Sequence, residues 1–254
     1  SKHLSHYYNL KNEITGRVIR DNPRPRNYSF LFDTTITTKE IAEQEIRLNW
    51  EYLKPRYLKD PKAKSIWDRF YGTTPYVKYD IFGTKTGRLG LRDGSFPILN
   101  FKKELRSAII PKWGSFVELD YNAAELRTLL ALAGKEQPNE DIHKWNSDVL
   151  GVSREEAKKS VISWLYGSKT SDIGEKLSQM YAREKVLSKH YDPEKGIVTT
   201  PFGRELEADE HHAMNYLVQS TTADLVFDRM LAIRDLLKGK KSFIKLILNF
   251  YFSI

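Results

Sequence analysis

The segment at residues 116–134 carries a carboxylate in a position suited to hold a metal ion. It reads FVELDYNAAELRTLLALAG, in which polar and apolar residues alternate up to Asp120 and an Ala/Leu-rich stretch follows. This pattern predicts a half-buried strand over 116–119 and then a helix that Asn122 caps and Gly134 ends. Mg²⁺ prefers oxygen ligands and keeps waters and substrate phosphates, so a carboxylate at a strand end suits it. The competing interpretation is a strand-terminal Asp that only caps the helix.

A second segment, residues 153–167, offers a cationic helix face. It reads SREEAKKSVISWLYG, and Ser153 with a Glu three residues later forms a capping-box pattern at a helix start. Arg154 and Lys158 lie one turn apart near the positive end of the helix dipole, and Tyr166 follows on the same side. The first turns would grip a triphosphate, and the last would offer an aromatic wall to a sugar and base. The competing interpretation is a solvated basic face with a buried aromatic end. Together, the carboxylate and the cationic face point to nucleotidyl transfer.

Composition narrows the classes of function. The 254 residues include 41 Lys and Arg against 33 Asp and Glu, so the formal net charge of +8 favours a polyanionic partner, although a merely basic protein fits it as well. The absence of Cys excludes disulfides, thiol catalysis and Cys-ligated zinc, and the six His form no HExxH pair. Residues 1–15 lack the apolar core of a secretory signal, and the apolar stretch 243–254 is shorter than the ~20 residues that span a bilayer. We therefore expect no membrane partner.

Hydrophobic periodicity and turn residues predict the surrounding elements. Residues 38–58 predict one amphipathic helix broken at Pro55, with a buried stripe of Ile41, Ile46, Trp50 and Leu53. Pro23 and Pro25 break any helix near the start of the chain. The other expectations are strands and turns over 75–111, a polar turn and a short helix over 135–152, helices over 168–190, a hairpin over 197–206, a long helix over 209–238 and a strand over 243–248.

Several segments, in order over roughly residues 75–230, resemble motifs of the polymerase module of family A DNA polymerases, the bacterial DNA polymerase I type. They are TGRL at 86–89, FPILNFKKELRSAIIP at 96–111, DYNAAELR at 120–127, DIH at 141–143, REEAKKSVISWLYG at 154–167 and NYLVQSTTAD at 215–224. The DYNAAELR segment resembles motif A, and the 154–167 segment resembles the fingers helix of motif B. Any one of these motifs is weak alone, but their order and internal spacing make a strong signal.

The resemblance implies metal and nucleotide roles. Asp120 would be catalytic and bind both Mg²⁺ ions, with the Tyr121 carbonyl as a further ligand. Glu125 would crowd a ribose 2′-OH and so select deoxynucleotides. The groups that would hold the triphosphate are His143, Arg154 and the catalytic Lys158.

The resemblance also implies contacts with the base pair. Tyr166 would close over the nascent pair, and Ile162 stands where the family usually has a Phe or Tyr facing the sugar. Arg88 and Gln219 would donate to minor-groove acceptors at the primer end, where the donor and acceptor pattern is degenerate and checks pair shape without demanding a sequence. Asn215 lies on the same palm helix as Gln219.

The implied fold is α+β, a right-hand palm with an antiparallel sheet and helical fingers. We expect a partial thumb-side or connecting segment over 1–75, the first part of the palm over 76–135, fingers over 136–196 and a return to the palm over 197–254. The implied activity is template-directed DNA synthesis, in which two-metal phosphoryl transfer moves deoxynucleotides from dNTPs to a primer 3′-OH. The implied partners are primer–template DNA and dNTPs, and the implied location is the cytoplasm of a bacterial or virus-infected cell.

Three departures from the family pattern stand out. Besides Ile162, His211 occupies a position where an Arg is often found. The second catalytic Asp would follow the strand expected at 243–248, yet residues 249–254 contain neither His nor a carboxylate. We therefore expect an incomplete or split polymerase that alone extends primers poorly, with a separate C-terminal polymerase fragment as a further partner. The alternatives are a noncatalytic nucleic-acid-binding remnant, a single-subunit RNA polymerase, and a basic structural protein.

Overall fold

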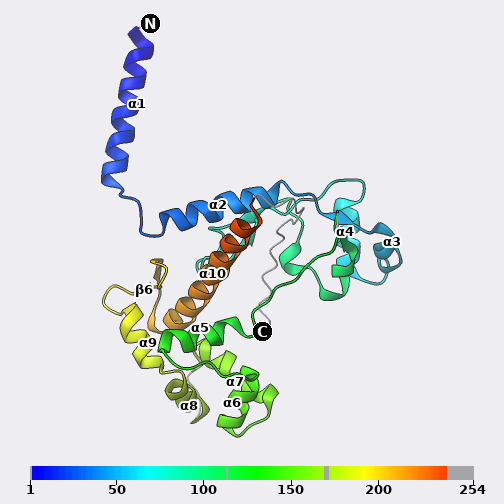
Figure 1. Cartoon of the computed structure of the whole chain (residues 1–254), viewed down its shortest axis with the longest axis vertical. Coiled ribbons are helices and arrows are strands. Elements are labelled where there is room, and N and C mark those ends of the chain that lie inside the picture. The colour runs from blue at the N-terminus through cyan, green and yellow to red at the C-terminus, as the bar shows by residue number, and fades with distance from the viewer. Residues whose placement is uncertain (1, 113, 169–171, 239–254) are drawn as a thin grey trace.

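The computed structural model describes residues 2–112, 114–168 and 172–238, in which helices dominate (Figure 1). The α-helices are α1 (Lys2–Asp21), α2 (Tyr28–Ala42), α3 (Trp50–Leu53), α4 (Pro61–Phe70), α5 (Ala124–Ala133), α6 (Ile142–Leu150), α7 (Arg154–Leu165), α8 (Asp172–Met180), α9 (Arg183–His190) and α10 (Glu210–Leu237). Short 3₁₀ turns lie at Lys54–Arg56, Ile98–Asn100 and Lys103–Ala108. Among the described residues, no helix combines the length and apolarity that a bilayer span requires.

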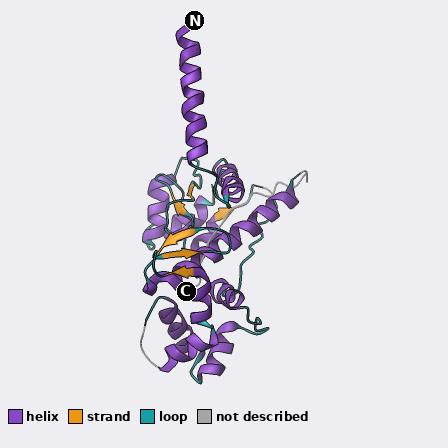
Figure 2. Cartoon of the chain, turned by 90° about the vertical axis from the view of Figure 1, so that its left-hand side faces the viewer, coloured by secondary structure: helices purple, strands orange, loops and turns teal. Residues whose placement is uncertain are grey.

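The strands form three small antiparallel sheets, drawn in orange in Figure 2. They are β1 (Arg47–Leu48) with β4 (Ile109–Ile110), β2 (Tyr79–Asp80) with β3 (Gly90–Leu91), and the three-stranded order β5 (Tyr191–Asp192), β6 (Ile197–Thr199) and β7 (Glu205–Glu207). The β6–β7 pair places Thr199 opposite Glu205, which confirms the hairpin predicted over 197–206.

The long helix α10 connects two hydrophobic cores. Its first half buries Met214 and Leu217 in a core shared with α5 to α9 and the β5–β7 sheet. Its second half buries Phe227 and Met230 in a core shared with α2, α3, α4 and the small sheets near them. Figure 1 shows α10 crossing from α2 to α5 and α9. Because the middle of the helix, residues 213–224, is covered on all sides, its sequence does not carry one apolar stripe and one polar stripe.

Helix α1 extends away from this body (Figure 1). The chain leaves it at Asp21 and enters α2 at Tyr28, so the break predicted at Pro23 and Pro25 is confirmed. Its large apolar side chains are exposed: Leu4, Tyr7, Tyr8, Leu10, Ile14, Val18 and Ile19.

The single helix predicted over 38–58 is wrong. Helix α2 ends at Ala42, β1 follows at Arg47–Leu48, and α3 begins at Trp50, where the Asn49 side chain accepts a hydrogen bond from the Tyr52 amide at 3.1 Å. Pairing of β1 with β4 replaces the helical hydrogen bonds that the local pattern suggested. The predicted stripe is nevertheless inside, since Ile41, Ile46 and Leu53 are buried and Trp50 is half-buried.

The strand predicted over 116–119 is also wrong. Residues 115–121 have no regular secondary structure, and Val117 and Leu119 are 82% and 74% exposed. A strand needs a neighbour for its backbone hydrogen bonds, and no segment in the described ranges pairs with this one. The palm sheet expected to carry Asp120 is therefore not present among the described residues. The strand predicted over 243–248 lies outside them.

Candidate functional site

Side chains from three distant segments meet at the middle of α10. Gln219 is 2% exposed, and its Nε2 donates to the Tyr166 hydroxyl at 2.8 Å. Its Oε1 accepts from the Thr86 hydroxyl at 3.4 Å, and Arg88 Nε donates to that same hydroxyl at 3.3 Å. The TGRL segment, the end of α7 and α10 are thus joined by one chain of hydrogen bonds, which we call the Gln219 cluster.

Glu125, in the first turn of α5, belongs electrostatically to this cluster. Burial raises the pKa of its carboxyl, and the nearby Arg88 guanidinium opposes that rise. The pKa of Tyr166 is also raised, first by burial and then by the charge of Glu125. Glu125 Oε1 is buried without a hydrogen-bond partner among the described residues. An unpaired buried acceptor beside a tyrosine and an arginine is suited to a ligand hydroxyl.

A buried ion pair lies beneath the TGRL turn. Arg204, just before β7, donates to the Asp224 carboxylate of α10 through Nε at 3.2 Å and through a terminal nitrogen at 2.7 Å. The Asp224 side chain is 0% exposed and that of Arg204 is 14% exposed. Gly87 has φ +76°, and a Cβ placed there would lie 2.7 Å from the guanidinium carbon of Arg204. Only a glycine therefore lets the turn that carries Arg88 rest on this pair.

Helices α6 and α7 present the predicted phosphate-binding groups. Ser153 caps α7 as the sequence predicts, accepting from the Glu156 amide at 3.3 Å. Asp141 caps α6 and binds the Arg154 guanidinium with contacts of 3.2 and 3.0 Å, which lowers the pKa of Asp141 to about 2. Arg154 is thus held in place by a carboxylate in this structure.

His143 and Lys158 lie near this pair. Burial lowers the pKa of His143, opposed by the charge of Asp141 and reinforced by Arg154 and Lys158. Because all three charges act on His143, the predicted triphosphate-binding groups share one region. His143 Nδ1 is buried without a partner among the described residues. Burial therefore favours the neutral form of the ring, and Nδ1 is available to a ligand.

The end of α7 is fixed by contact with α10. Tyr166 is 40% exposed, and Gly167 follows it with φ +92°. A Cβ at Gly167 would lie 2.4 Å from the His211 ring, so glycine is required there. The half-buried Ile162 lies one turn before Tyr166. With a rise of 1.5 Å per residue, Lys158 lies about 12 Å along the helix from Tyr166.

Asp120 and Tyr121 are exposed. The segment behind them is anchored by Arg127, whose guanidinium donates to the carbonyls of Asn122, Pro138 and Glu140 at 3.1, 3.1 and 3.3 Å. The predicted cap by Asn122 is wrong, because Ala123 occupies the cap position with φ +48° and makes no side-chain bond. Instead of capping the helix with its side chain, Asn122 accepts a hydrogen bond from Arg127 through its backbone carbonyl.

The remaining predicted side chain, Asn215, is 7% exposed on α10, and its Oδ1 is buried without a partner among the described residues. It lies one turn before Gln219, and therefore on the side of α10 that faces the cluster.

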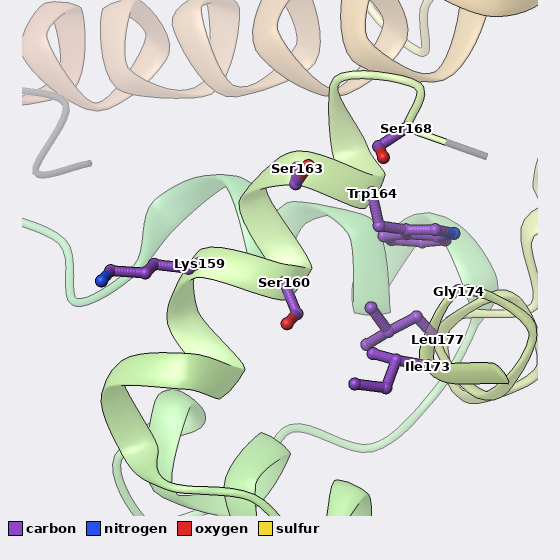
Figure 3. Close-up of a pocket in the computed structure, with 8 residues that line it drawn as sticks. All are labelled: Lys159, Ser160, Ser163, Trp164, Ser168, Ile173, Gly174 and Leu177. Carbon is purple, nitrogen blue, oxygen red and sulfur yellow. The ribbon is translucent and has the colours of Figure 1, made fainter. Parts of the chain in front are cut away.

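A separate pocket of about 250 Å³ lies between α7 and α8 (Figure 3). Its lining is Lys159, Ser160, Ser163, Trp164, Ser168, Ile173, Gly174 and Leu177. None of these residues belongs to the predicted site, so the pocket lies on a different side of α7 from Lys158 and Tyr166.

Sequence reasoning missed several residues that build this site. Arg204 and Asp224 are 20 residues apart, and no spacing rule links a loop arginine to a helical aspartate. Arg127 stood within a recognised motif, but its bonds go to carbonyls of a loop that has no sequence signature. A usable signal was Asp224 itself, since an ionisable residue within a helix covered on all sides requires a partner.

Comparison with known structures supports this geometry at the level of the fold. The chain resembles the POL domain of Pol1 from M. smegmatis in complex with DNA primer-template and dNTP, with a TM-score of 0.52 and 18% sequence identity. The match covers 75% of this chain and 46% of that one, so the chain spans less than half the length of the polymerase domain it matches. No protein-family model and no curated protein matches the sequence. The chain therefore has a polymerase-like fold built from helices and small antiparallel sheets.

Proposed function

We propose that this chain serves template-directed DNA synthesis of the family A type, with dNTPs and primer–template DNA as its ligands. The observation that carries the proposal is the Gln219 cluster, in which Arg88, Glu125, Tyr166 and Gln219 meet although they come from four separate segments. These are the segments that the sequence resemblance assigns to the nucleotide and the primer end. The polymerase-like fold supports the same conclusion.

In the proposed complex, α7 and α6 bind the triphosphate. The primer 3′-OH loses its proton to water as its oxygen bonds the α-phosphorus, the bond from that phosphorus to the bridging oxygen breaks, and pyrophosphate leaves. Lys158 and Arg154 stabilise the negative charge on the departing oxygens, and His143 adds a hydrogen bond. Positioning and charge neutralisation supply most of the catalysis in this class of reaction.

The sugar and base occupy the other end of α7. Glu125 and Tyr166 crowd the position of a ribose 2′-OH, and Ile162 offers the sugar a smaller surface than an aromatic ring. Arg88 and Gln219 reach minor-groove acceptors of the primer-terminal pair. Asn215 lies beside them with an unpaired oxygen.

The described residues supply one candidate metal ligand set, Asp120 with the Tyr121 carbonyl. No group of three or more His, Cys, Asp or Glu within the described ranges could cage an ion. These two groups fit Mg²⁺ that arrives with the triphosphate, since that ion is commonly held by one or two carboxylates together with substrate phosphates. When bound, it would neutralise phosphate charge.

Nucleotide binding and primer extension test the proposal separately. The purified chain, with Mg²⁺ and primer–template, should bind a fluorescent dNTP and extend the primer little or not at all. Lys158→Ala should weaken dNTP binding about 10- to 100-fold, as expected for a lost bond to a charged group. Lys159→Ala, on the pocket side of the same helix, is the matched control and should not. Equal losses in both variants would refute the assigned face, and robust extension would refute the expected impairment.

The second candidate function is noncatalytic binding of nucleic acid, motivated by the finding that no group of three or more His, Cys, Asp or Glu in the described ranges could hold a metal ion. It predicts primer–template binding without any dNTP dependence. A single-subunit RNA polymerase predicts a preference for ribonucleotides, and comparing dATP with ATP in the binding assay decides that point.

A further inference from the structure

The segment at residues 47–71 carries an unusual surface concentration of positive charge. It contains seven Lys and Arg against three Asp and Glu, so a tenth of the chain holds +4 of the net +8. In the part of the chain that the structure describes, none of these seven cations forms an ion pair. Elsewhere, Arg and Lys repeatedly pair with carboxylates, as Arg234 does with Glu40 at 2.6 Å. The positive charge of this segment is therefore not neutralised by carboxylates, although the Arg56 guanidinium donates to the Tyr52 carbonyl at 2.7 Å.

Aromatic rings gather on the same segment. Trp67 of α4 and Tyr71 just after it are stacked, with ring centres 4.4 Å apart and planes 9° apart. Trp50 of α3 stands edge-on to both, at 5.4 and 5.2 Å, and Tyr57 stands edge-on to Trp67 at 5.9 Å. We call these four rings the aromatic platform. Figure 1 shows α3 and α4 beside each other at the edge of the molecule.

The stack ends at Tyr71 and is open there. Trp50 and Trp67 are partly buried against the hydrophobic core, whereas Tyr71 is 58% exposed. Two rings contact Tyr71 within the described ranges, against three that contact Trp67. The Tyr71 backbone is fixed at the end of α4, where its amide donates to the Trp67 carbonyl at 2.9 Å. Tyr71 is thus the terminal ring of the stack, and its exposed side can accept one more planar group.

The helix periodicity brings charge to this ring. Ala63, Ile66 and Phe70 face the core, which leaves Lys64 and Tyr71, seven residues apart, on the outer face. Lys64 Nζ lies 5.8 Å from the centre of the Tyr57 ring.

Two of the three acidic residues of this segment have hydrogen-bond or ion-pair partners. The Tyr57 hydroxyl bonds Asp68, which raises the pKa of Tyr57, and Asp60 caps α4 while pairing with Lys102 at 3.2 Å. Glu51 is exposed. The surface around the open ring is therefore net positive.

We propose that the aromatic platform and the cations of residues 47–71 bind single-stranded nucleic acid, with one base stacked on Tyr71 and adjacent phosphates near Lys64. Basic surfaces with exposed aromatic rings bind single strands because every base has a π-face and every nucleotide a charge. A duplex hides its base faces within its own stack except at its two ends, so it offers a terminal tyrosine far fewer faces than a single strand does. This surface shares no residue with the proposed nucleotide site, and the two can fail independently.

The test uses the full chain and a fluorescein-labelled 12-nucleotide oligothymidylate, with binding measured by anisotropy. Tyr71→Ala should weaken binding about 5- to 100-fold, the range expected for loss of one stacked base. Tyr71→Trp should retain binding, which separates stacking from misfolding. Tyr8→Ala, at a comparably exposed ring on α1, is the control and should bind as the unmodified chain does.

Salt dependence tests the charged part. Lys64→Gln should reduce the slope of log K against log salt by about 0.7, the value for one phosphate contact on a single strand. The exposed Lys176 of α8 provides the control substitution Lys176→Gln, which should leave the slope unchanged.

Several outcomes would overturn the proposal. If Tyr71→Ala binds oligothymidylate as well as the unmodified chain does, the proposed stacking contact is refuted. If Tyr71→Ala loses as much affinity for a blunt 12-base-pair duplex as for oligothymidylate, stacking of an unpaired base is not responsible. Polyglutamate competing as well as oligothymidylate, charge for charge, would indicate an acidic protein partner instead. Oligouridylate binding equal to oligothymidylate supports recognition of bases and phosphates alone. Tyr71→Ala should leave dNTP binding intact, so failure here is distinguishable from failure of the proposed function.

Discussion

Replacement of Arg204 by Met tests whether the buried ion pair supports the TGRL turn. The Arg204 guanidinium makes two hydrogen bonds with Asp224, whose side chain is 0% exposed, and it touches Gly87 from below. Met keeps much of the side-chain volume but removes the charge, so Arg204→Met leaves an ionised carboxylate buried without compensation. The turn that carries Arg88 loses its support at the same time.

Removing one partner of a buried ion pair costs about 3–5 kcal/mol. A chain of this size shifts its melting temperature by about 2–4 °C per kcal/mol, so the Tm of Arg204→Met should fall by about 6–20 °C. The double variant Arg204→Met/Asp224→Leu replaces both charges by apolar groups, which is commonly neutral or stabilising, and should recover most of that loss.

The pH dependence has a definite sign. Burial raises the pKa of Asp224, more strongly than Arg204 lowers it. A carboxyl with a raised folded-state pKa favours folding at pH values below its unfolded pKa, and this contribution is lost as pH rises through the folded pKa. Without Arg204 the pKa of Asp224 rises further. The stability gap between the unmodified chain and Arg204→Met should therefore be largest near pH 7 and narrow towards pH 4.

Thermal unfolding followed by circular dichroism at both pH values measures the gap. A loss of less than about 1 kcal/mol in Arg204→Met, or a double variant no more stable than the single one, would refute the assignment of a stabilising buried pair. A gap that widens at low pH would refute the charge argument.

Three further predictions concern other parts of the candidate site. Gly167→Ala should cost more than the 1–2 kcal/mol of left-handed strain because its Cβ meets the His211 ring, and adding His211→Ala should recover only the excess in a melting experiment. Glu125→Gln should gain stability over the unmodified chain as pH rises above the ordinary Glu pKa, since burial raises the pKa of Glu125. A difference in urea midpoint between the two chains that is the same at pH 4 and pH 7 would contradict this. Asp141→Ala should cost about 1–2 kcal/mol through the lost cap and the half-exposed pair with Arg154, whereas Asp141→Asn should keep most of the cap. Because the pKa of Asp141 is lowered to about 2, the contribution of its charge should be complete above the ordinary Asp pKa and be lost progressively as pH falls from that value through about 2.

Local signals in the sequence were sufficient to predict an element correctly where that element depends on residues close to it in the chain. Ser153 caps α7 as predicted, the hairpin turn follows Thr200, and the long helix ends at Leu237 within a residue of the prediction. In each of these, a cap, a turn or continuous helical hydrogen bonding is contained within a short stretch of chain.

The errors arose where an element needs a distant partner. The alternation of apolar and polar residues over 116–119 indicates which side chains could share one face of a strand. A strand forms, however, only when another backbone pairs with it through hydrogen bonds. In residues 38–58, the helical pattern lost to pairing of Leu48 with Ile109, which are 61 residues apart in sequence. The contacts of Arg88, Tyr166 and Gln219 could be expected from motif order, whereas the Arg204–Asp224 pair beneath them could not.

The polar middle of α10 explains why the site forms where the two cores meet. Gln219, Thr222 and Asp224 are buried between the apolar residues of the two halves of this helix. Each bonds a different element: Gln219 reaches α7, Asp224 reaches the loop before β7, and the Thr222 hydroxyl donates to a threonine hydroxyl of α5 at 3.0 Å. An apolar helix centre would pack equally well in several rotations and shifts, but these bonds require one register. The same helix therefore sets the positions of Tyr166, Glu125 and the TGRL turn relative to one another, and a fault in any of the three bonds should be felt by the other two.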